Sequence, residues 1–455
     1  MCIRDSRDGA HVIISESTFQ RNHARVSGGV LQFSSAEVEI TRSTFISNRA
    51  EHLGGIIDTH RGKLTINESQ FQNNTAFLAG VVGSEQSNIT ISESDFICNA
   101  ADSNGGVLTM NVTILTIVQT SFTNNTARFG GVLWAEQSTV NSHFITFNDN
   151  SAEIDGGVCR TKQTNTIISR AKFRSNRAGK NGGSMYTDRG TTNISDSKFD
   201  HNIANIEGGV FYIKKTNTTM VRTKFSHNMA GKIGGIMYSD GGTVSISDSK
   251  FDHNSADLDG GVFHAKQTGT RVSGTSFSHN RADNKGGIMY ADRGMTSISD
   301  SKFDHNTAGN DGGVIRSYLS EMSISGSVFI NNRAENEGGV LYTDQSTLNM
   351  YQSSFTNNTA NAGGIMRADQ CTSIINQSSF INNTASTGGV MWTEQTTITS
   401  HVVYITNNHA NFGTVYLLES TTLWSDITFS DNEGCLLYTS PSPRDATLSR
   451  MPSSA

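Results

Sequence analysis

The sequence predicts an all-β fold, a right-handed parallel β-helix (a solenoid) of about 17 rungs with 25–26 residues in each rung. Three observations support this prediction. A short phrase recurs at nearly constant spacing along the chain. Apolar and polar residues alternate inside each repeat, as they do in half-buried strands. No repeat contains an amphipathic helical stretch of ten or more residues.

The repeat is defined by the phrase Phe-x-x-Asn-x-Ala, followed eight or nine residues after the Phe by Gly-Gly-Val or Gly-Gly-Ile. Successive copies are 25 or 26 residues apart until the last interval, which is 24. A unit of this size cannot bury its apolar face alone, so it must stack on its neighbours. The copies begin at Phe19, Phe45, Phe71, Phe96, Phe122, Phe147, Phe173, Phe199, Phe225, Phe251, Phe277, Phe303, Phe329, Phe355, Phe380, Ile405 and Phe429.

Each repeat is expected to form short strands separated by turns. Val244 and Ile246 alternate with polar residues, which is the period-2 pattern of a half-buried strand. The Ser-Asp-Ser that follows is expected to form a corner, after which Phe251 re-enters the core. A second strand is expected after the Gly-Gly pair. By the same alternation, the Val or Ile directly after Gly-Gly is expected to point outward unless a bulge intervenes.

In-register stacking would place equivalent residues above one another at ~4.8 Å. We expect an interior column of Phe rings beside a column of Asn. Asn tolerates the left-handed backbone of tight turns, and its amide can bond to the Asn of the next rung. These structural ladders are clearest at Phe199, Phe225, Phe251, Phe277 and Phe303, and at Asn202, Asn228, Asn254, Asn280 and Asn306.

Charge placement supports the same register. Five residues after the second Gly, the sign of the charge alternates over seven consecutive rungs, as part of a 52-residue super-repeat. Each charge would then lie between two opposite charges, an arrangement that contributes about 0.2–1 kcal/mol per pair. The alternating residues are Glu136, Lys162, Asp188, Lys214, Asp240, Lys266 and Asp292.

The two ends are interpreted as artefacts. Residues 1–6 and 435–455 correspond to the two orientations of a transposase sequencing adapter translated in frame, and all three prolines lie in the second segment. Residues 7–434 are therefore treated as a single β-helix domain, expected to be an interior piece of a longer solenoid. The cysteines of this domain, Cys98, Cys159 and Cys371, are too far apart to indicate a disulfide framework or a metal cluster.

Composition argues against a nucleic-acid partner and against a membrane-spanning helix. The net charge is -6, with interspersed signs and no basic block, which argues against nucleic acid. No apolar run approaches the ~20 residues that a membrane-spanning helix needs, so no membrane span is expected in this fragment.

A column of aromatic and cationic residues, three positions after the second Gly, is the first candidate site. If the alternating charges two positions later face solvent, this outer stripe lies on the same face. It could bind a carbohydrate or a protein partner. Alternatively, its rings and guanidinium groups only shield the sheet. The outer stripe comprises Trp134, Arg160, Tyr186, Tyr212, Tyr238, His264, Tyr290, Arg316, Tyr342, Arg367 and Trp392.

A column of histidines two residues after successive Phe residues is the second candidate. Asp200, Asp252 and Asp304 stand beside alternate members, so the column could hold a divalent metal ion. The alternative is that duplication copied a tolerated residue at a solvent-facing corner. This histidine column comprises His201, His227, His253, His279 and His305.

The sequence contains no recognisable motif for catalysis or for binding a cofactor. Hydrolysis by two carboxyl groups needs a defined separation and one raised pKa, whereas Asp and Glu here mostly occupy equivalent repeat positions that are expected to be exposed. No nucleophilic Ser or Cys with a partner His is recognisable, and Gly-Gly after every rung is turn chemistry. We therefore expect a non-enzymatic chain without a cofactor.

The paired phrases Gly-Gly-Val/Ile-Leu/Met and Phe-x-x-Asn-x-Ala resemble the repeat of the chlamydial-type polymorphic outer-membrane proteins. The resemblance spans residues 7–434 and departs from the family in preferring Val or Ile where the family has Ala. It implies a surface-exposed, often adhesive β-helix that is extracellular or at the cell surface, in the outer membrane if the source is bacterial.

Three functional hypotheses follow. The first is a non-enzymatic adhesin or scaffold that binds a surface glycan or a protein along its outer face. The second is a polysaccharide lyase or glycoside hydrolase, because the pectate-lyase-like superfold to which such a solenoid belongs also hosts these enzymes. The third is a passive stalk.

Overall fold

The computed structural model describes residues 10–440, which fall into two compact units, residues 10–245 (unit 1) and residues 246–440 (unit 2). Every regular element among these residues is a β-strand. Within the described part of the chain there is accordingly no helix of the length and apolarity needed to cross a membrane.

One repeat forms four short strands. In unit 1 a typical repeat consists of β16 (Leu108–Asn111), β17 (Ile114–Val118), β18 (Ser121–Thr123) and β19 (Thr126–Phe129). In unit 2 a typical repeat consists of β40 (Met289–Asp292), β41 (Met295–Ser299), β42 (Lys302–Asp304) and β43 (Thr307–Ala308). In some repeats the first two strands are continuous, as in β24 (Cys159–Ser169), β27 (Met185–Ser195) and β30 (Phe211–Val221).

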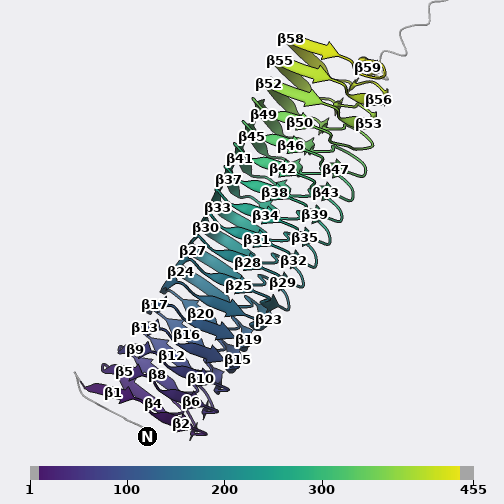
Figure 1. The fold of residues 1–455 in the computed structure, drawn as a ribbon. Helices are drawn as coiled ribbons and strands as arrows, with labels where there is room; N and C mark the ends of the chain where they lie inside the picture. Colours follow the sequence, from purple (N-terminus) through teal and green to yellow (C-terminus); the bar gives the residue numbers. More distant parts are fainter. Residues whose placement is uncertain (1–9, 441–455) are drawn as a thin grey trace, which may run out of the picture. The chain divides into compact units, whose positions relative to one another are not determined.

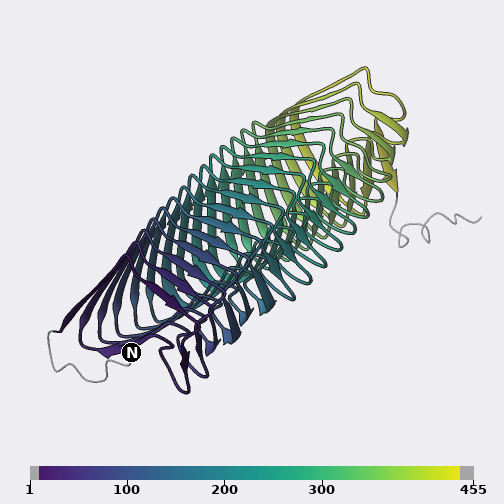
Figure 2. The ribbon, with the colours of Figure 1, turned by 60° about the horizontal axis from the view of Figure 1, so that its bottom comes forward.

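Each strand pairs in parallel with the equivalent strand of the next repeat. In unit 1, Ile91 of β13 (Asn88–Ser92) lies opposite Ile117 of β17. In unit 2, Ile298 of β41 lies opposite Ile324 of β45 (Glu321–Ser325). Within each unit the equivalent strands lie side by side, and the chain makes one turn per repeat (Figures 1 and 2). The prediction of a parallel β-helix stacked in register is confirmed.

The interior of each unit contains the predicted column of Phe rings. Phe45 and Phe71 stack with their ring centroids 4.9 Å apart and their planes 1° from parallel. In unit 2, Phe303 and Phe329 stack at 4.6 Å and 3°. These rings are almost completely buried, so they contribute both apolar burial and ring-stacking contacts.

The Val or Ile after Gly-Gly is buried and does not point outward, because the bulge that the expectation named as its exception is present. The amides of Val107 and Leu108 both donate to the carbonyl of Val132, each at 2.9 Å, which is the bulge that breaks the alternation. Both side chains are consequently buried, with 0% exposure. Glycine is required before them, because Gly105 has a φ of +60° and a Cβ there would lie 2.0 Å from the Leu108 carbonyl oxygen.

The predicted Asn column joins each repeat to the next. The backbone N–H and the Nδ2 of Asn176 donate to Oδ1 of Asn202 at 3.1 and 2.9 Å. Nδ2 of Asn202 in turn donates to Oδ1 of Asn228 at 2.9 Å and to the carbonyl of Phe173 at 3.1 Å. All three Asn residues have 0% exposure. Each ladder Asn therefore satisfies buried polar groups of two neighbouring repeats.

The left-handed residue at this corner is the one before the ladder Asn, and not the Asn itself. His201 has a φ of 55° and His305 a φ of 54°. Other repeats place Asn there, as at Asn331, with a φ of 55°. Most repeats thus place Asn, Asp or His at this corner, which are the types enriched at positive φ, although Arg21, Ser47, Cys98 and Ser175 also occupy it.

The alternating charges stack as predicted within each unit. Glu136 pairs with Lys162 in register, and Lys162 with Asp188. The Lys162 Nζ lies 2.6 Å from the Glu136 carboxylate. Asp188 also forms an ion pair with the adjacent Arg189 at 3.2 Å. Since these groups are partly exposed, each pair stabilises the fold only modestly.

Part of the segment interpreted as adapter-derived is described. Within it, β59 (Leu437–Ser440) pairs in parallel with β57 (Val415–Leu418). Residues 1–6 and 441–455 lie outside the described residues.

We predict that Asn202→Ala lowers the free energy of unfolding by about 3 kcal/mol, because it leaves several buried donors and acceptors without a partner. Urea unfolding followed by circular dichroism measures this change. The matched control is Asn193→Ala, at an exposed position of β27, which should change stability by less than about 0.5 kcal/mol. Equal losses in both variants would contradict a stabilising role for the ladder.

Candidate functional site

The outer stripe lies in the strands that follow Gly-Gly. Within β20 (Leu133–Glu136), half-buried Trp134 alternates with buried Leu133 and Ala135, so its side chain is on the outer face. The same alternation places Tyr342 outward in β48 (Leu341–Asp344). Two members differ from the expectation of exposure. Arg316 and Arg367 are only 7% and 6% exposed, because neighbouring rings and acids cover them.

The tyrosines of the stripe in unit 1 cover one another's faces. Tyr186 and Tyr212 stack at 4.7 Å and 5°, and Tyr212 and Tyr238 stack at 4.9 Å and 21°. Burial raises the pKa of Tyr212 well above its ordinary value, so its hydroxyl stays protonated. This part of the stripe therefore offers ring edges and hydroxyl groups to a ligand, while the ring faces are occupied.

A groove of about 270 Å³ lies over the stripe at the point where the tyrosine stack ends. In β16, the equivalent strand of the preceding repeat, the residue opposite Trp134 is Thr109, which has no ring to cover the indole. The guanidinium of Arg160 lies 4.3 Å from the Phe129 ring centroid and 5.1 Å from that of Tyr186. The groove is lined by Asn104, Phe129, Trp134, Glu136, Arg160, Thr161, Lys162, Tyr186 and Asp188.

A buried acid lies close to this groove, although it does not line it. Asp155 is 7% exposed, and burial raises the pKa of its carboxyl despite the nearby Arg160. Asn181 Nδ2 donates to Asp155 Oδ1 at 3.1 Å. Asp259 and Asp311 occupy the same position of the repeat, directly before Gly-Gly, and burial raises their pKa values too. Sequence analysis missed these acids, although their position beside Gly-Gly was a usable signal.

In unit 2 the charged groups of the stripe pair mainly with one another, although Nε of Arg316 and Nε and Nη1 of Arg367 have no hydrogen-bond partner among the described residues. Arg316 lies 4.0 Å from the Tyr342 ring centroid and 3.2 Å from the Asp344 carboxylate. Arg367 forms ion pairs with Asp369 at 2.7 Å and with Glu394 at 3.1 Å. The Tyr342 hydroxyl donates to Asp369 at 2.8 Å. Here the geometry agrees with the shielding interpretation, since the polar groups bind one another.

The histidine column lies at exposed corners. Side chains of its members are 50–55% exposed. Asp200 joins His201 and His227 in one group, and Asp252 joins His253 and His279 in another. His305 lies 2.7 Å from Asp304.

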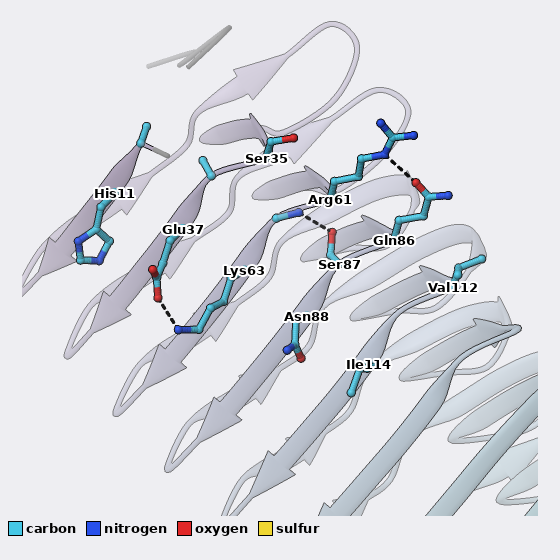
Figure 3. A pocket seen from close by; sticks show the side chains of 13 residues that line it. His11, Ser35, Glu37, Arg61, Lys63, Gln86, Ser87, Asn88, Val112 and Ile114 are labelled. Carbon is cyan, nitrogen blue, oxygen red and sulfur yellow. Dashed lines mark hydrogen bonds and ion pairs between the residues drawn. The ribbon is translucent and has the colours of Figure 1, made fainter. Parts of the chain in front are cut away.

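A second groove, of about 580 Å³, follows a corner of the first repeats of unit 1 (Figure 3). Lys63 donates to Glu37 at 2.5 Å, and this hydrogen bond lowers the pKa of the Glu37 carboxyl. Arg61 Nε donates to Gln86 at 2.9 Å. The residues that line this second groove contain no aromatic ring apart from the imidazole of His11. These side chains largely pair with one another, so this groove is less suited to sugar binding than the first.

Protonation of His264 is expected to weaken the fold in acid. His264 in β36 (Phe263–Lys266) stacks on Tyr290 at 4.8 Å, and burial lowers its pKa to about 4. The pKa of a His in the unfolded chain is about 6.5. Between these values only the unfolded chain binds the proton, so stability present above pH ~6.5 should be lost as the pH falls towards 4, by up to about 3 kcal/mol.

The variant His264→Tyr, which carries the ring found at Tyr290, should lose less stability over the same pH interval. Urea unfolding of both proteins at pH 7 and pH 4.5 measures the difference. If both lost the same stability, His264 would not be the responsible group.

Comparisons with known proteins complete the description of the site. Residues 326–344 match the family model described as the Chlamydia polymorphic membrane protein (Chlamydia_PMP) repeat. A search of curated proteins found no match. Among solved structures, the chain is similar to one titled "Structure of PL6 family alginate lyase AlyGC", with a TM-score of 0.19 and 6% identity over 96% of this chain and 98% of that chain.

The matched segment contains both repeat phrases, Phe329-x-x-Asn332 and Gly338-Gly339. The fold and this match are consistent with a surface protein. Residues 326–344 are thus similar to a repeat of the Chlamydia polymorphic membrane protein type, carried on a parallel β-helix.

Proposed function

We propose that this chain is part of a cell-surface protein that binds a carbohydrate in the groove over Trp134, Arg160 and Tyr186, without chemically altering it. The observation that supports this proposal best is the composition of the groove, which brings an indole, a guanidinium and a phenol together over the outer stripe.

These groups suit a sugar ring. The apolar face of a pyranose packs on aromatic rings, while its hydroxyl groups need donors and acceptors around the edge. Arg160 supplies fixed donors, since its guanidinium contacts two rings, those of Phe129 and Tyr186. Lys162 and Glu136 form an ion pair at the rim of the groove. At about 270 Å³ the groove fits one ring of a longer polysaccharide chain.

The carboxylates around the groove favour binding over hydrolysis. Glu136 and Asp188 line it, and they form ion pairs with Lys162 and Arg189. Acid catalysis of glycoside cleavage needs a carboxyl group that is kept protonated and faces the substrate. The acid with a raised pKa, Asp155, is buried and is not among the lining residues.

We predict that Trp134→Ala weakens glycan binding about tenfold, since it removes an aromatic contact worth about 1.4 kcal/mol with a bound sugar. Tyr186→Ala should also weaken binding, because it removes a ring edge and a hydroxyl from the groove and one of the rings that hold Arg160. The full chain would first be screened on an array of neutral and acidic surface glycans. Affinities of the variants for the selected glycan would then be measured by calorimetry.

The matched control is Tyr290→Ala, which removes the same side chain from the same column in unit 2, outside the groove. It should bind as the unaltered chain does. Binding to no glycan on the array would favour a passive stalk. Release of reducing or unsaturated sugar ends from the selected glycan would show a degrading enzyme and contradict the proposal.

A further inference from the structure

The same three-residue group occurs once in each unit. In unit 1, Nδ1 of His201 lies 3.2 Å from Oδ1 of Asp200, and Nδ1 of His227 lies 3.9 Å from the same oxygen. Each group offers two imidazole nitrogens and one carboxylate oxygen within 4.8 Å of one another.

The group of unit 2 reproduces this geometry. His253 and His279 lie 3.1 and 3.8 Å from Oδ1 of Asp252. The two groups are 52 residues apart, so the arrangement recurs with the 52-residue super-repeat. Its three side chains come from two neighbouring rungs, one supplying Asp and His and the next supplying the second His.

The backbone presents both imidazoles of a group on the same side. His201 and His227 have φ values of 55° and 53°, and their rings stack at 4.8 Å and 11°. His253 and His279 both have positive φ as well, and their rings stack at 4.7 Å and 7°. Because all four side chains are about half exposed, a solvated ion can reach them.

Each carboxylate is oriented by a neighbouring serine. Ser226 Oγ donates to Oδ1 of Asp200 at 2.6 Å, and Ser278 Oγ donates to Oδ1 of Asp252 at 2.6 Å. Burial opposes ionisation of Asp200, but the serine hydrogen bond and Lys198 prevail and lower its pKa. Lys198 approaches the other oxygen, Oδ2, at 3.4 Å, so Oδ1 is the oxygen turned towards the histidines.

We propose that Asp200–His201–His227 and Asp252–His253–His279 each bind one divalent transition-metal ion of the Zn²⁺ class. Two imidazoles and one carboxylate form a borderline donor set that Zn²⁺ prefers over hard cations such as Mg²⁺. Three protein ligands leave a coordination position for water. The serine donors supply the outer hydrogen bonds that fix such carboxylate ligands.

The chain contains its own control. His305 lies 2.7 Å from Asp304, as in the two groups, but the equivalent position of the next repeat is Asn331. Asp304 has no second imidazole beside it on the next repeat, so this pair should not form a third site of the same kind, although the His305 ring stacks on that of His279 at 5.1 Å. Asn at this corner keeps the left-handed backbone, with a φ of 55° at Asn331. His→Asn variants should therefore remove a ligand while preserving the fold.

The test is calorimetric titration of ZnCl₂ into the full chain without a polyhistidine tag. His227→Asn and His279→Asn should each lose one equivalent of bound Zn²⁺ relative to the unaltered chain, and the double variant should lose two. His305→Asn should lose none. MgCl₂ should give no saturable binding.

Three outcomes would overturn the proposal. The first is the absence of saturable Zn²⁺ binding in the unaltered chain. The second is unchanged stoichiometry in the double variant. The third is a loss in His305→Asn equal to that in His227→Asn, which would indicate scattered surface histidines. Circular dichroism of each variant distinguishes loss of a ligand from loss of the fold.

Discussion

The structure depends on one buried contact, in which the amide of each ladder Asn binds the Asn of the next repeat. Oδ1 of Asn202 accepts from two donors of Asn176, and Nδ2 of Asn202 donates onward to Asn228. A shift of one residue in any repeat would expose this side chain and leave its buried partners without hydrogen bonds. The contact therefore sets the register, and the register decides which side chains stack inside and outside.

The same register limits what the outer face can bind. Identical residues in consecutive repeats stack on each other, as Tyr186 and Tyr212 do at 4.7 Å, and their faces are then closed to a ligand. A binding surface arises where the column changes its residue type. The change from Thr109 to Trp134 and then to Arg160 provides such a place. Specific binding in a repetitive fold thus depends on irregular positions.

Sequence periodicity was sufficient to predict the fold, because spacing and alternation determine which residues stack. Periodicity was not sufficient to predict which way the side chain after Gly-Gly points, because a bulge there turns Val107 inward. It also could not show that Asp155 is buried or that Arg367 is covered, since both depend on side chains of neighbouring repeats. The groove at Trp134 was missed for the same reason, although its aromatic and cationic members were identified.

The corners show how such a repeat can change its chemistry without changing its fold. Each corner before a ladder Asn requires positive φ, and Asn, Asp and His all satisfy it, as at Asn331, Asp149 and His201. An exchange between these residues leaves the buried hydrogen bonds intact and alters only an exposed side chain. Two imidazoles in neighbouring rungs beside one Asp are therefore compatible with the scaffold, because the corner constrains only the backbone conformation.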